Sequence, residues 1–386
     1  MRIVYAALDQ RVPGTTGGSV HVCAVAEGLA ALGHDVDVLA TPGSGPFPAG
    51  RARWHAMPPP LGIRHLRSLR TGAVRAFARQ AGADVIIERY HNFGGEGVRA
   101  ARDIGALSVL EVNAPVIDHP GSLKAWLDKA LLVEPMRRRR EWQCRVADLL
   151  VTPTAEILPA FVPPDRIVEL EWGADTDAFS PGARGPVPFT RRPGAVVAVF
   201  AGAFRAWHGA VNLVRAMRQL RADGRLDIDA VFIGDGPELA RAQAEAAGIS
   251  GVTFTGAVAH SLMPACLAAA DIGVAPFDAT AHPPLQLAFY WSPLKVFEYM
   301  AAGLPVVAPA IPRLARILGP DCAGLLYDPR APRALADTIA RVAADDYERR
   351  RIGTAARERV CREFSWAAHC RRLEEAIRQA RQRRST

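Results

Sequence analysis

The sequence predicts an α/β protein built from two doubly wound domains with parallel sheets. Short apolar runs alternate with helical periodicity along most of the 386 residues. This cycle restarts after a segment rich in Pro and Gly at 180–194. Strands that alternate with helices form parallel sheets covered on both faces. We therefore expect an N-terminal domain at 1–182 and a C-terminal domain at 190–369, which the length also favours.

In the first half, a buried strand at 2–8 precedes a glycine-rich turn and a helix. Further strands are expected at 35–40, 84–88, 107–112, 148–153 and 166–172. Two helices carry apolar residues on one face: Val22, Val25, Leu29 and Leu32 in the first, and Leu66, Leu69, Ala73 and Phe77 in the second.

In the second half, the same alternation predicts strands at 196–202, 230–234, 252–256, 272–277, 305–310 and 324–328. A last helix is expected at 366–382. Ligands of doubly wound sheets bind beyond the carboxyl ends of the strands. Motifs in those loops are therefore the candidates for function.

The composition indicates a globular protein with an anionic partner. The net charge is +8, and all but three of the 47 cationic residues are arginine. Such an excess suits nucleotides, phosphate esters, acidic membranes or nucleic acid. The six cysteines show no metal-ligand spacing, and we expect no export signal and no membrane span, so a cytoplasmic location is predicted.

The segment SPLKVFEYMAAGLPVV at 292–307 carries the strongest functional signal. Ser292 suits the N-cap of a helix and Pro293 its first position. Lys295 then lies in the first turn, where the helix dipole disfavours a cation unless a phosphate is bound. Glu298 shares its face and could accept hydrogen bonds from ribose hydroxyls. The alternative is an exposed ion pair between Lys295 and Glu298.

Two loops after predicted strands form further candidate phosphate sites. FAGAFRAWHG at 200–209 holds Gly202, Arg205 and His208 between a strand and a helix. GTTGGSVHV at 14–22 places Gly17 and Gly18 where the backbone can approach a ligand closely. Each loop could equally be a plain connection.

Other features are weaker. Two strand ends turn through glycine and suit backbone contacts with a base or ribose, at Gly234, Gly236 and Val258. The run Arg137–Arg140 is most simply a solvated helix face, and the alternative is contact with an anionic membrane or acceptor.

In this order the motifs resemble the retaining glycosyltransferases of family 4, also called glycosyl transferases group 1, which have the GT-B fold. The resemblance extends from the GG-x-x-H of 17–21 to FSW at 364–366, and SPLKVFEYMAAG is its most specific part. It implies that Glu298 is the second Glu of an E-x7-E motif, whose first position here is Tyr290. It also implies that the helix at 370–386 packs back on the N-terminal domain.

The resemblance implies further departures at the catalytic positions. Ala203 and His208 occupy the usual Arg and Lys positions after the strand, so Arg205 and Lys295 would replace them. Asn113 stands where the family has a histidine, and His21 is a further candidate. The implied catalytic set is Lys295, Arg205, Asn113 and His21. The implied donor site is Gly17, Gly18, Gly202, His208, Gly234, Gly236, Val258, Tyr290, Ser292, Leu294, Lys295 and Glu298.

The expected activity is transfer of a sugar, with retention, from a nucleotide-diphosphate sugar to a hydroxyl group, and the family favours UDP-sugars. Side-chain cations would stabilise the leaving diphosphate, so neither metal nor cofactor is expected. The acceptor could be a polysaccharide intermediate, a lipid carrier or a small natural product. A sugar-nucleotide epimerase is the alternative enzyme. A nucleic-acid-binding protein is disfavoured because no aromatic-basic motif is evident.

Overall fold

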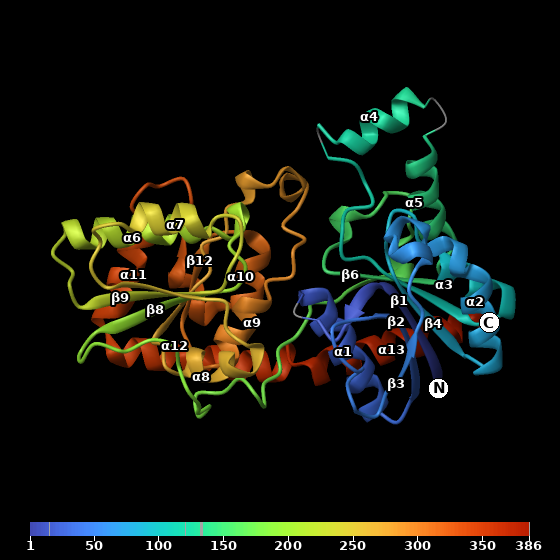
Figure 1. Cartoon of the computed structure of the whole chain (residues 1–386), viewed down its shortest axis with the longest axis horizontal. Coiled ribbons are helices and arrows are strands. Elements are labelled where there is room, and N and C mark those ends of the chain that lie inside the picture. Colours follow the sequence, from blue (N-terminus) through green and yellow to red (C-terminus); the bar gives the residue numbers. More distant parts are fainter. Residues whose placement is uncertain (15, 120, 132–133, 386) are drawn as a thin grey trace. The chain divides into compact units, whose positions relative to one another are not determined.

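The computed structural model describes residues 1–14, 16–119, 121–131 and 134–385. The chain forms two compact units (Figure 1). Unit 1 comprises Met1–Trp172, Tyr290–Ser292 and Trp366–Thr386, and unit 2 comprises Gly173–Phe289 and Pro293–Ser365. Each contains one parallel sheet and alternates strands with helices, so the predicted fold class is confirmed.

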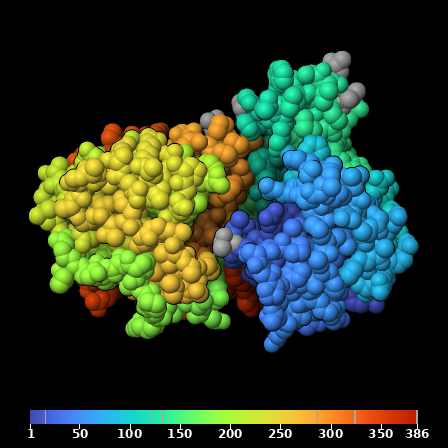
Figure 2. All heavy atoms as spheres, in the orientation of Figure 1, coloured from blue at the N-terminus to red at the C-terminus, as the bar shows by residue number. Residues whose placement is uncertain are grey.

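Within the described residues, seven parallel strands form the sheet of unit 1, in the order β3-β2-β1-β4-β5-β6-β7. The strands are β1 Arg2–Val12, β2 Asp35–Pro42, β3 Arg53–Ala56, β4 Val85–Arg89, β5 Leu107–Glu111, β6 Leu149–Thr152 and β7 Ile167–Glu169. The helices are α1 Gly17–Ala31, α2 Thr71–Gln80, α3 Glu96–Ile104, α4 Leu123–Ala130, α5 Pro135–Val146 and α13 Trp366–Ser385. Of these, α4 lies on the surface of the unit (Figure 1, Figure 2).

Strand β1 explains why both faces of this sheet are covered. Its side chains alternate between two cores: Ile3 and Tyr5 belong to one, whereas Val4 and Ala6 belong to the other. A strand has a side-chain period of two, so an unbroken apolar run places apolar groups on both faces. Burial on each face then requires a helical layer on each face.

Helix α13 completes the first of these cores. It packs against α1, and Cys370, Leu373 and Ile377 lie in the cluster that also contains Val25 and Leu29 of α1. The end of the chain is thus part of unit 1. Among the described helices, none combines the length and the apolar character that crossing a bilayer requires.

The sheet of unit 2 contains six parallel strands among the described residues, in the order β10-β9-β8-β11-β12-β13. The strands are β8 Val196–Ala201, β9 Ile228–Ile233, β10 Val252–Gly256, β11 Ile272–Val274, β12 Val306–Pro309 and β13 Leu326–Tyr327. The helices are α6 Ala210–Ala222, α7 Leu239–Ala246, α8 Met263–Ala268, α9 Leu294–Ala301, α10 Pro312–Leu318, α11 Ala334–Ala344 and α12 Asp346–Glu363.

The division between the units falls at Trp172 rather than near residue 182. The reason lies in the segment that follows. The Ala174 N–H donates to the Phe364 carbonyl, Arg357 donates to the Phe179 carbonyl, and the Phe179 side chain is 2% exposed. Residues 173–179 are therefore part of unit 2, as is the Pro- and Gly-rich segment at 180–194.

The continuous helix predicted from Leu66, Leu69, Ala73 and Phe77 is wrong. A 3₁₀ helix covers Arg64–Arg70, and α2 begins only at Thr71. Leu69 is 69% exposed, whereas Arg67 is fully buried. Ion pairs with buried carboxylates keep the Arg67 side chain inside the unit. The apolar residues of this segment therefore do not determine which of its sides is buried.

We predict that Ile377→Ala lowers the free energy of unfolding of unit 1 by about 2–5 kcal/mol, because it leaves a cavity where α13 meets the sheet. Denaturant unfolding followed by circular dichroism would measure this. The matched control is Gln379→Ala, an exposed change on the same helix, which should stay within about 0.5 kcal/mol of wild type. Equal effects of the two changes would contradict a core position for Ile377.

Candidate active site

Lys295 is a buried cation at the start of α9 in unit 2. Its side chain is 8% exposed, and Nζ lies 4.0 Å from the centroid of the Phe200 ring and 5.5 Å from that of Phe277. Within the described residues, Nζ has no hydrogen-bond partner. The predicted alternative, an exposed ion pair with Glu298, is therefore wrong.

The surroundings of Lys295 disfavour its charge. Burial lowers the pKa of Lys295 to about 7, and nearby Glu298 only partly opposes this effect. The first turn of a helix adds a further unfavourable field for a cation. Two aromatic faces compensate in part through cation–π attraction. An anion bound at Nζ would reverse the balance, because it would supply the missing counter-charge.

Gly202 leaves space for this ammonium at the carboxyl end of β8. Its φ is +126°, in the region that favours glycine. A Cβ atom there would lie 3.3 Å from Cε and 3.4 Å from Nζ of Lys295. Residue 202 therefore has a backbone and a spatial reason to be glycine, and its backbone lies directly beside the ammonium.

His208 and Arg205 follow in the same loop. Nδ1 of His208 lies 2.5 Å from the Ala203 carbonyl, which can only accept, so Nδ1 carries the proton. Burial, with a contribution from Lys295, lowers the pKa of His208 to about 3. His208 is therefore neutral and adds no positive charge. Arg205 is exposed, and its guanidinium lies 5.5 Å from the Trp207 ring centroid.

Arg205 also lines a small pocket at the N-terminus of α6. The pocket has a volume of about 100 Å³, and Gly209, Ala210 and Asn212 are among its other lining residues. The first amides of a helix have no intrahelical partner and favour anions. Unit 2 thus presents two cations at the carboxyl end of β8, one buried and one exposed.

Gly234 and Gly236 have a packing reason to be glycine. A Cβ at Gly234 would overlap the Gly202 carbonyl, and one at Gly236 would lie 2.8 Å from the Phe204 nitrogen. Their φ values, +132° and +149°, also favour glycine. These glycines let the turns after β8 and β9 pack together. Contact with a donor at these glycines stays a prediction, as it does at Val258, which is half-buried after β10.

The segment before α9 departs from the predicted cap. Pro293, not Ser292, is the N-cap of α9, and no side-chain hydrogen bond caps this helix. The Ser292 hydroxyl oxygen is buried without a partner in the described part of the chain. Tyr290 is 4% exposed, while Leu294 is half-buried as the first residue of α9.

Glu298 is oriented by a partner other than Lys295. Its Oε1 atom lies 3.7 Å from His260 Nε2, and the two side chains are 17% and 55% exposed. Hydrogen bonding to this carboxylate raises the pKa of His260. Glu298 is thus held near the surface of unit 2, and its predicted ribose contact stays a prediction.

His21 belongs to a buried network of unit 1. Its ring is fully buried, 4.2 Å from the Trp172 centroid, and Nε2 lies 2.8 Å from Glu111 Oε1. Arg89 Nη1 lies 3.0 Å from Nδ1, and an arginine can only donate. Burial lowers the pKa of His21, so the ring is neutral with its proton on Nε2. His21 is therefore a neutral, buried member of this network, and its catalytic role stays a prediction.

The remaining predicted residues of unit 1 are more accessible. Gly17 and Gly18 are half-buried and open α1, which is capped by the Thr16 side chain. Asn113 follows β5 and accepts a hydrogen bond from Trp172 Nε1 at 3.1 Å. Its Nδ2 is buried without a partner in the described ranges. A contact of Asn113 with a ligand stays a prediction.

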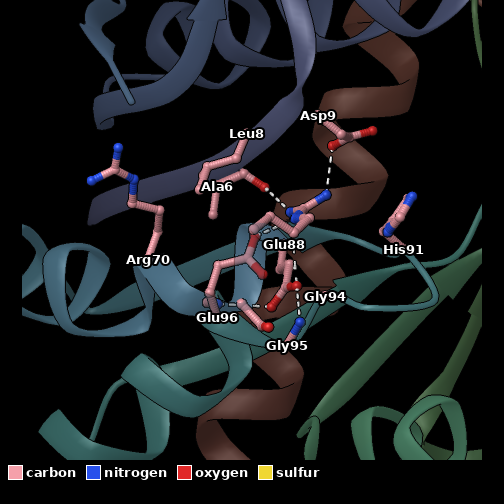
Figure 3. A network of polar contacts seen from close by, with 12 residues as sticks. Ala6, Leu8, Asp9, Arg70, Glu88, His91, Gly94, Gly95 and Glu96 are labelled. Carbon is pink, nitrogen blue, oxygen red and sulfur yellow. Dashed lines mark hydrogen bonds and ion pairs between the residues drawn. The ribbon is translucent and has the colours of Figure 1, made fainter. Parts of the chain in front are cut away.

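Sequence reasoning missed a buried ionic network in unit 1 (Figure 3). Arg67 lies between Asp9, Glu88 and Glu96, with Nη1 2.6 Å from Asp9 Oδ1 and Nε bonded to Glu96. Glu88 also accepts from the N–H groups of Gly97 and Val98 at 2.8 Å, at the start of α3. A carboxylate at a helix N-terminus is favourable.

The basic run of α5 does not form one solvated face. Arg140 is buried and donates twice to Asp118, at 2.8 and 3.0 Å. Arg139 donates to the Gly94 carbonyl and stacks on Trp142. Only Arg137 and Arg138 are exposed. The predicted membrane contact through Arg137–Arg140 is therefore wrong for the buried half of the run.

Comparison with known proteins identifies domains in both units. Residues 15–178 match the family described as Glycosyltransferase Family 4, and residues 195–345 match Glycosyl transferases group 1. The chain is 30% identical over 223 residues to the D-inositol 3-phosphate glycosyltransferase of Corynebacterium glutamicum, which covers 54% of this chain and 51% of that protein. The match thus spans about half of that relative.

A second relative extends over nearly the whole chain. The GDP-mannose-dependent alpha-mannosyltransferase of Mycobacterium tuberculosis is 28% identical over 97% of this chain and 96% of its own length. Among solved structures, Anabaena HepE in complex with UDP-glucose has a TM-score of 0.69 at 16% identity, covering 98% and 100% of the two chains. Sucrose-phosphate synthase from Thermosynechococcus elongatus has a TM-score of 0.67 at 21% identity, covering 98% of each chain. These structural likenesses establish the GT-B fold.

We predict that affinity for a nucleoside diphosphate falls as the pH rises from 7 to 9. The pKa of Lys295 is lowered in the free protein, so the fraction of molecules with a neutral Lys295 grows as the pH rises. In those molecules, binding of the anion must be accompanied by uptake of a proton, which weakens the measured affinity. The dissociation constant should rise about tenfold per pH unit well above the pKa. Titration calorimetry with UDP and GDP would measure this slope.

The matched variants are Lys295→Met and Lys129→Met. Lys295→Met removes the titrating group but keeps an apolar side chain in a buried place, so its affinity should be low and nearly independent of pH. Lys129→Met, at an exposed lysine of unit 1, should keep the wild-type slope. An unchanged slope in Lys295→Met would rule out Lys295 as the titrating group.

Proposed function

We propose that this chain, whose residues 15–178 match Glycosyltransferase Family 4 and 195–345 match Glycosyl transferases group 1, is a glycosyltransferase that binds its nucleotide-sugar donor at Lys295 in unit 2. We further propose that it transfers the sugar to a hydroxyl acceptor with retention of configuration and without a metal. The observation that carries the proposal is the buried, unpartnered ammonium beside Gly202. A diphosphate is the ligand that this arrangement favours.

The proposed reaction breaks the bond between the anomeric carbon and the β-phosphate oxygen. Negative charge then develops on the diphosphate, and in this proposal Lys295 and Arg205 stabilise it. Such fixed cations act more strongly on the transition state than on the bound donor. The acceptor hydroxyl forms the new bond to the anomeric carbon and transfers its proton to the departing phosphate oxygen. No enzymic nucleophile is needed in this scheme.

Three features support a donor site in this part of unit 2. His208 is neutral and does not compete with the lysine for the anion. Gly202 lacks a Cβ, so its backbone allows a phosphate to approach Nζ closely. We propose that Glu298, three residues beyond Lys295 and 3.7 Å from His260, accepts hydrogen bonds from the ribose. Asn113, with its free amide donor, is proposed to contact the acceptor.

An experiment is needed to identify the base and the sugar of the donor. The sequence resemblance favours UDP-sugars, whereas a relative that spans the whole chain is named for GDP-mannose. The names of relatives also suggest acceptors with hydroxyl-rich rings, because one acts on D-inositol 3-phosphate. A parallel screen of UDP- and GDP-sugars, read by thermal stabilisation and by release of the nucleoside diphosphate, tests the proposal.

We predict that either the UDP-sugars or the GDP-sugars stabilise the wild-type protein and are turned over. We also predict that Lys295→Ala lowers kcat about 100–1,000-fold. Removing one preorganised partner of a developing charge has an effect of this size. Lys295→Arg should not restore the rate, because a planar guanidinium cannot replace a compact ammonium in a buried place. Nucleoside diphosphate release measured under saturating donor would give both values.

The control is Lys129→Ala, which removes an exposed lysine and should keep the wild-type rate. Turnover of Lys295→Ala within about threefold of wild type would refute a role for Lys295 and shift the site toward Arg205. Interconversion of sugar epimers without release of nucleoside diphosphate would instead favour the epimerase.

We predict that turnover persists in excess EDTA, because side chains supply the positive charge at the diphosphate. Initial rates should agree with and without chelator, and added Mg²⁺ or Mn²⁺ should not raise them. Complete loss of activity that either metal restores would contradict metal independence. Inactivation that neither metal reverses would point to an effect of the chelator on folding, which circular dichroism would reveal.

A further inference from the structure

Helix α4 has its polar and apolar faces reversed relative to an ordinary surface helix. Leu123, Trp126, Leu127 and Leu131 are 68%, 64%, 38% and 56% exposed, whereas Asp128 is only 2% exposed. Positions i, i+3, i+4 and i+8 share one side of a helix. The apolar stripe therefore faces solvent, and the segment that carries it stands on the surface in Figure 2.

The structure holds α4 firmly in this orientation. Asp128 accepts hydrogen bonds from the Met136 and Arg137 N–H groups at 3.0 and 2.8 Å, at the start of α5. The Ser122 hydroxyl caps α4 by accepting from the Ala125 N–H. Turning the helix to bury its apolar stripe would break the contact of Asp128 with α5. Hydrogen bonds between Asp128 and the start of α5 thus accompany the exposure of the stripe.

The charges around the stripe indicate what covers it. Among the described residues of 121–145, five Lys or Arg are exposed, whereas Asp128 is buried and Glu134 and Glu141 are half-buried. Lys124 and Lys129, two of the three lysines of the chain, lie on α4 itself, and Arg138 is exposed on α5. A tryptophan and leucines flanked by cations match the boundary between headgroups and acyl chains of an anionic bilayer.

The size of the stripe also favours a bilayer over a protein. A standard protein interface takes about 20–30 residues from each partner. The four exposed apolar side chains of α4 are far fewer than the residues of such an interface. A bilayer needs no shape complementarity, and it accepts Trp and Leu together while lysines extend to the headgroups.

We propose that α4 docks unit 1 on an anionic lipid surface, with Leu123, Trp126, Leu127 and Leu131 entering the interface and Lys129 and Arg138 contacting headgroups. This docking is independent of the donor site. It requires neither donor nor acceptor, so it is tested without turnover.

The test is flotation of the full chain with vesicles of phosphatidylcholine containing phosphatidylglycerol, and with vesicles of phosphatidylcholine alone. The protein should float with the anionic vesicles and only weakly with the neutral ones, and high salt should release it. Trp126→Asp should reduce vesicle binding at least about tenfold. Lys129→Glu should reduce it about fivefold or more, since each cation near the surface contributes on that scale.

Matched controls separate docking from general stickiness and from misfolding. Leu226→Asp changes a leucine of unit 2 that is 57% exposed and should bind vesicles like wild type. Arg79→Glu changes an exposed arginine of α2 in the same way. Leu123→Ser is a milder change on α4 and should also weaken binding, while far-UV circular dichroism should match wild type for every variant.

Two outcomes would overturn the proposal. One is a wild-type chain that stays with neither type of vesicle, or a Trp126→Asp variant that floats as well as wild type. The other is a wild-type dimer in light scattering that Trp126→Asp converts to a monomer, without any vesicle binding. In that case a second copy of the chain, not a bilayer, covers the stripe.

Discussion

The buried ammonium of Lys295, for which the described chain supplies no hydrogen-bond partner, constrains much of unit 2. The end of β8 provides Gly202, whose φ of +126° favours glycine and whose lack of a Cβ leaves room beside Cε and Nζ of Lys295. Phe200 and Phe277 supply the faces that make burial tolerable. Burial, with a smaller contribution from the lysine charge, lowers the pKa of His208 and keeps it neutral. The buried charge is unfavourable in the free protein, and an anion bound at Nζ would supply the missing counter-charge.

Unit 1 solves the same electrostatic problem differently. Arg67 is also fully buried, but Asp9, Glu88 and Glu96 surround it. Its charge is neutralised within the chain, so this network orders β1, β4 and the start of α3 rather than recruiting a ligand. The contrast between the two buried cations separates structure from function. A satisfied charge stabilises a unit, whereas an unsatisfied one indicates a binding site.

The sequence predicted the parallel sheets and the anomaly at Lys295, since both depend on local patterns. Strand periodicity is visible within a few residues, and the conflict between a cation and a helix N-terminus is visible within one turn. Prediction from the sequence failed where contacts between distant segments determine which side chains are buried. The partners of Arg67 come from three other segments, so a local pattern could not predict its burial. The segment that contains it is a 3₁₀ helix rather than the start of a helix at 66–77. Ser292 looked like a cap, but the local conformation moved that position to Pro293.

A contact with another segment also explains why the exposed apolar stripe of α4 was not predicted. Its stripe is an ordinary amphipathic pattern, and the pattern alone assigns the apolar face to the core. Asp128 reverses this assignment, because its two hydrogen bonds with α5 cannot form unless the polar side faces inward. The stripe of α4 is apolar but exposed to water, and the ammonium of Lys295 is charged but buried. Each group therefore lies in surroundings that are unfavourable for it. They lie in different units, so binding at one site can stabilise its own unit without requiring the other.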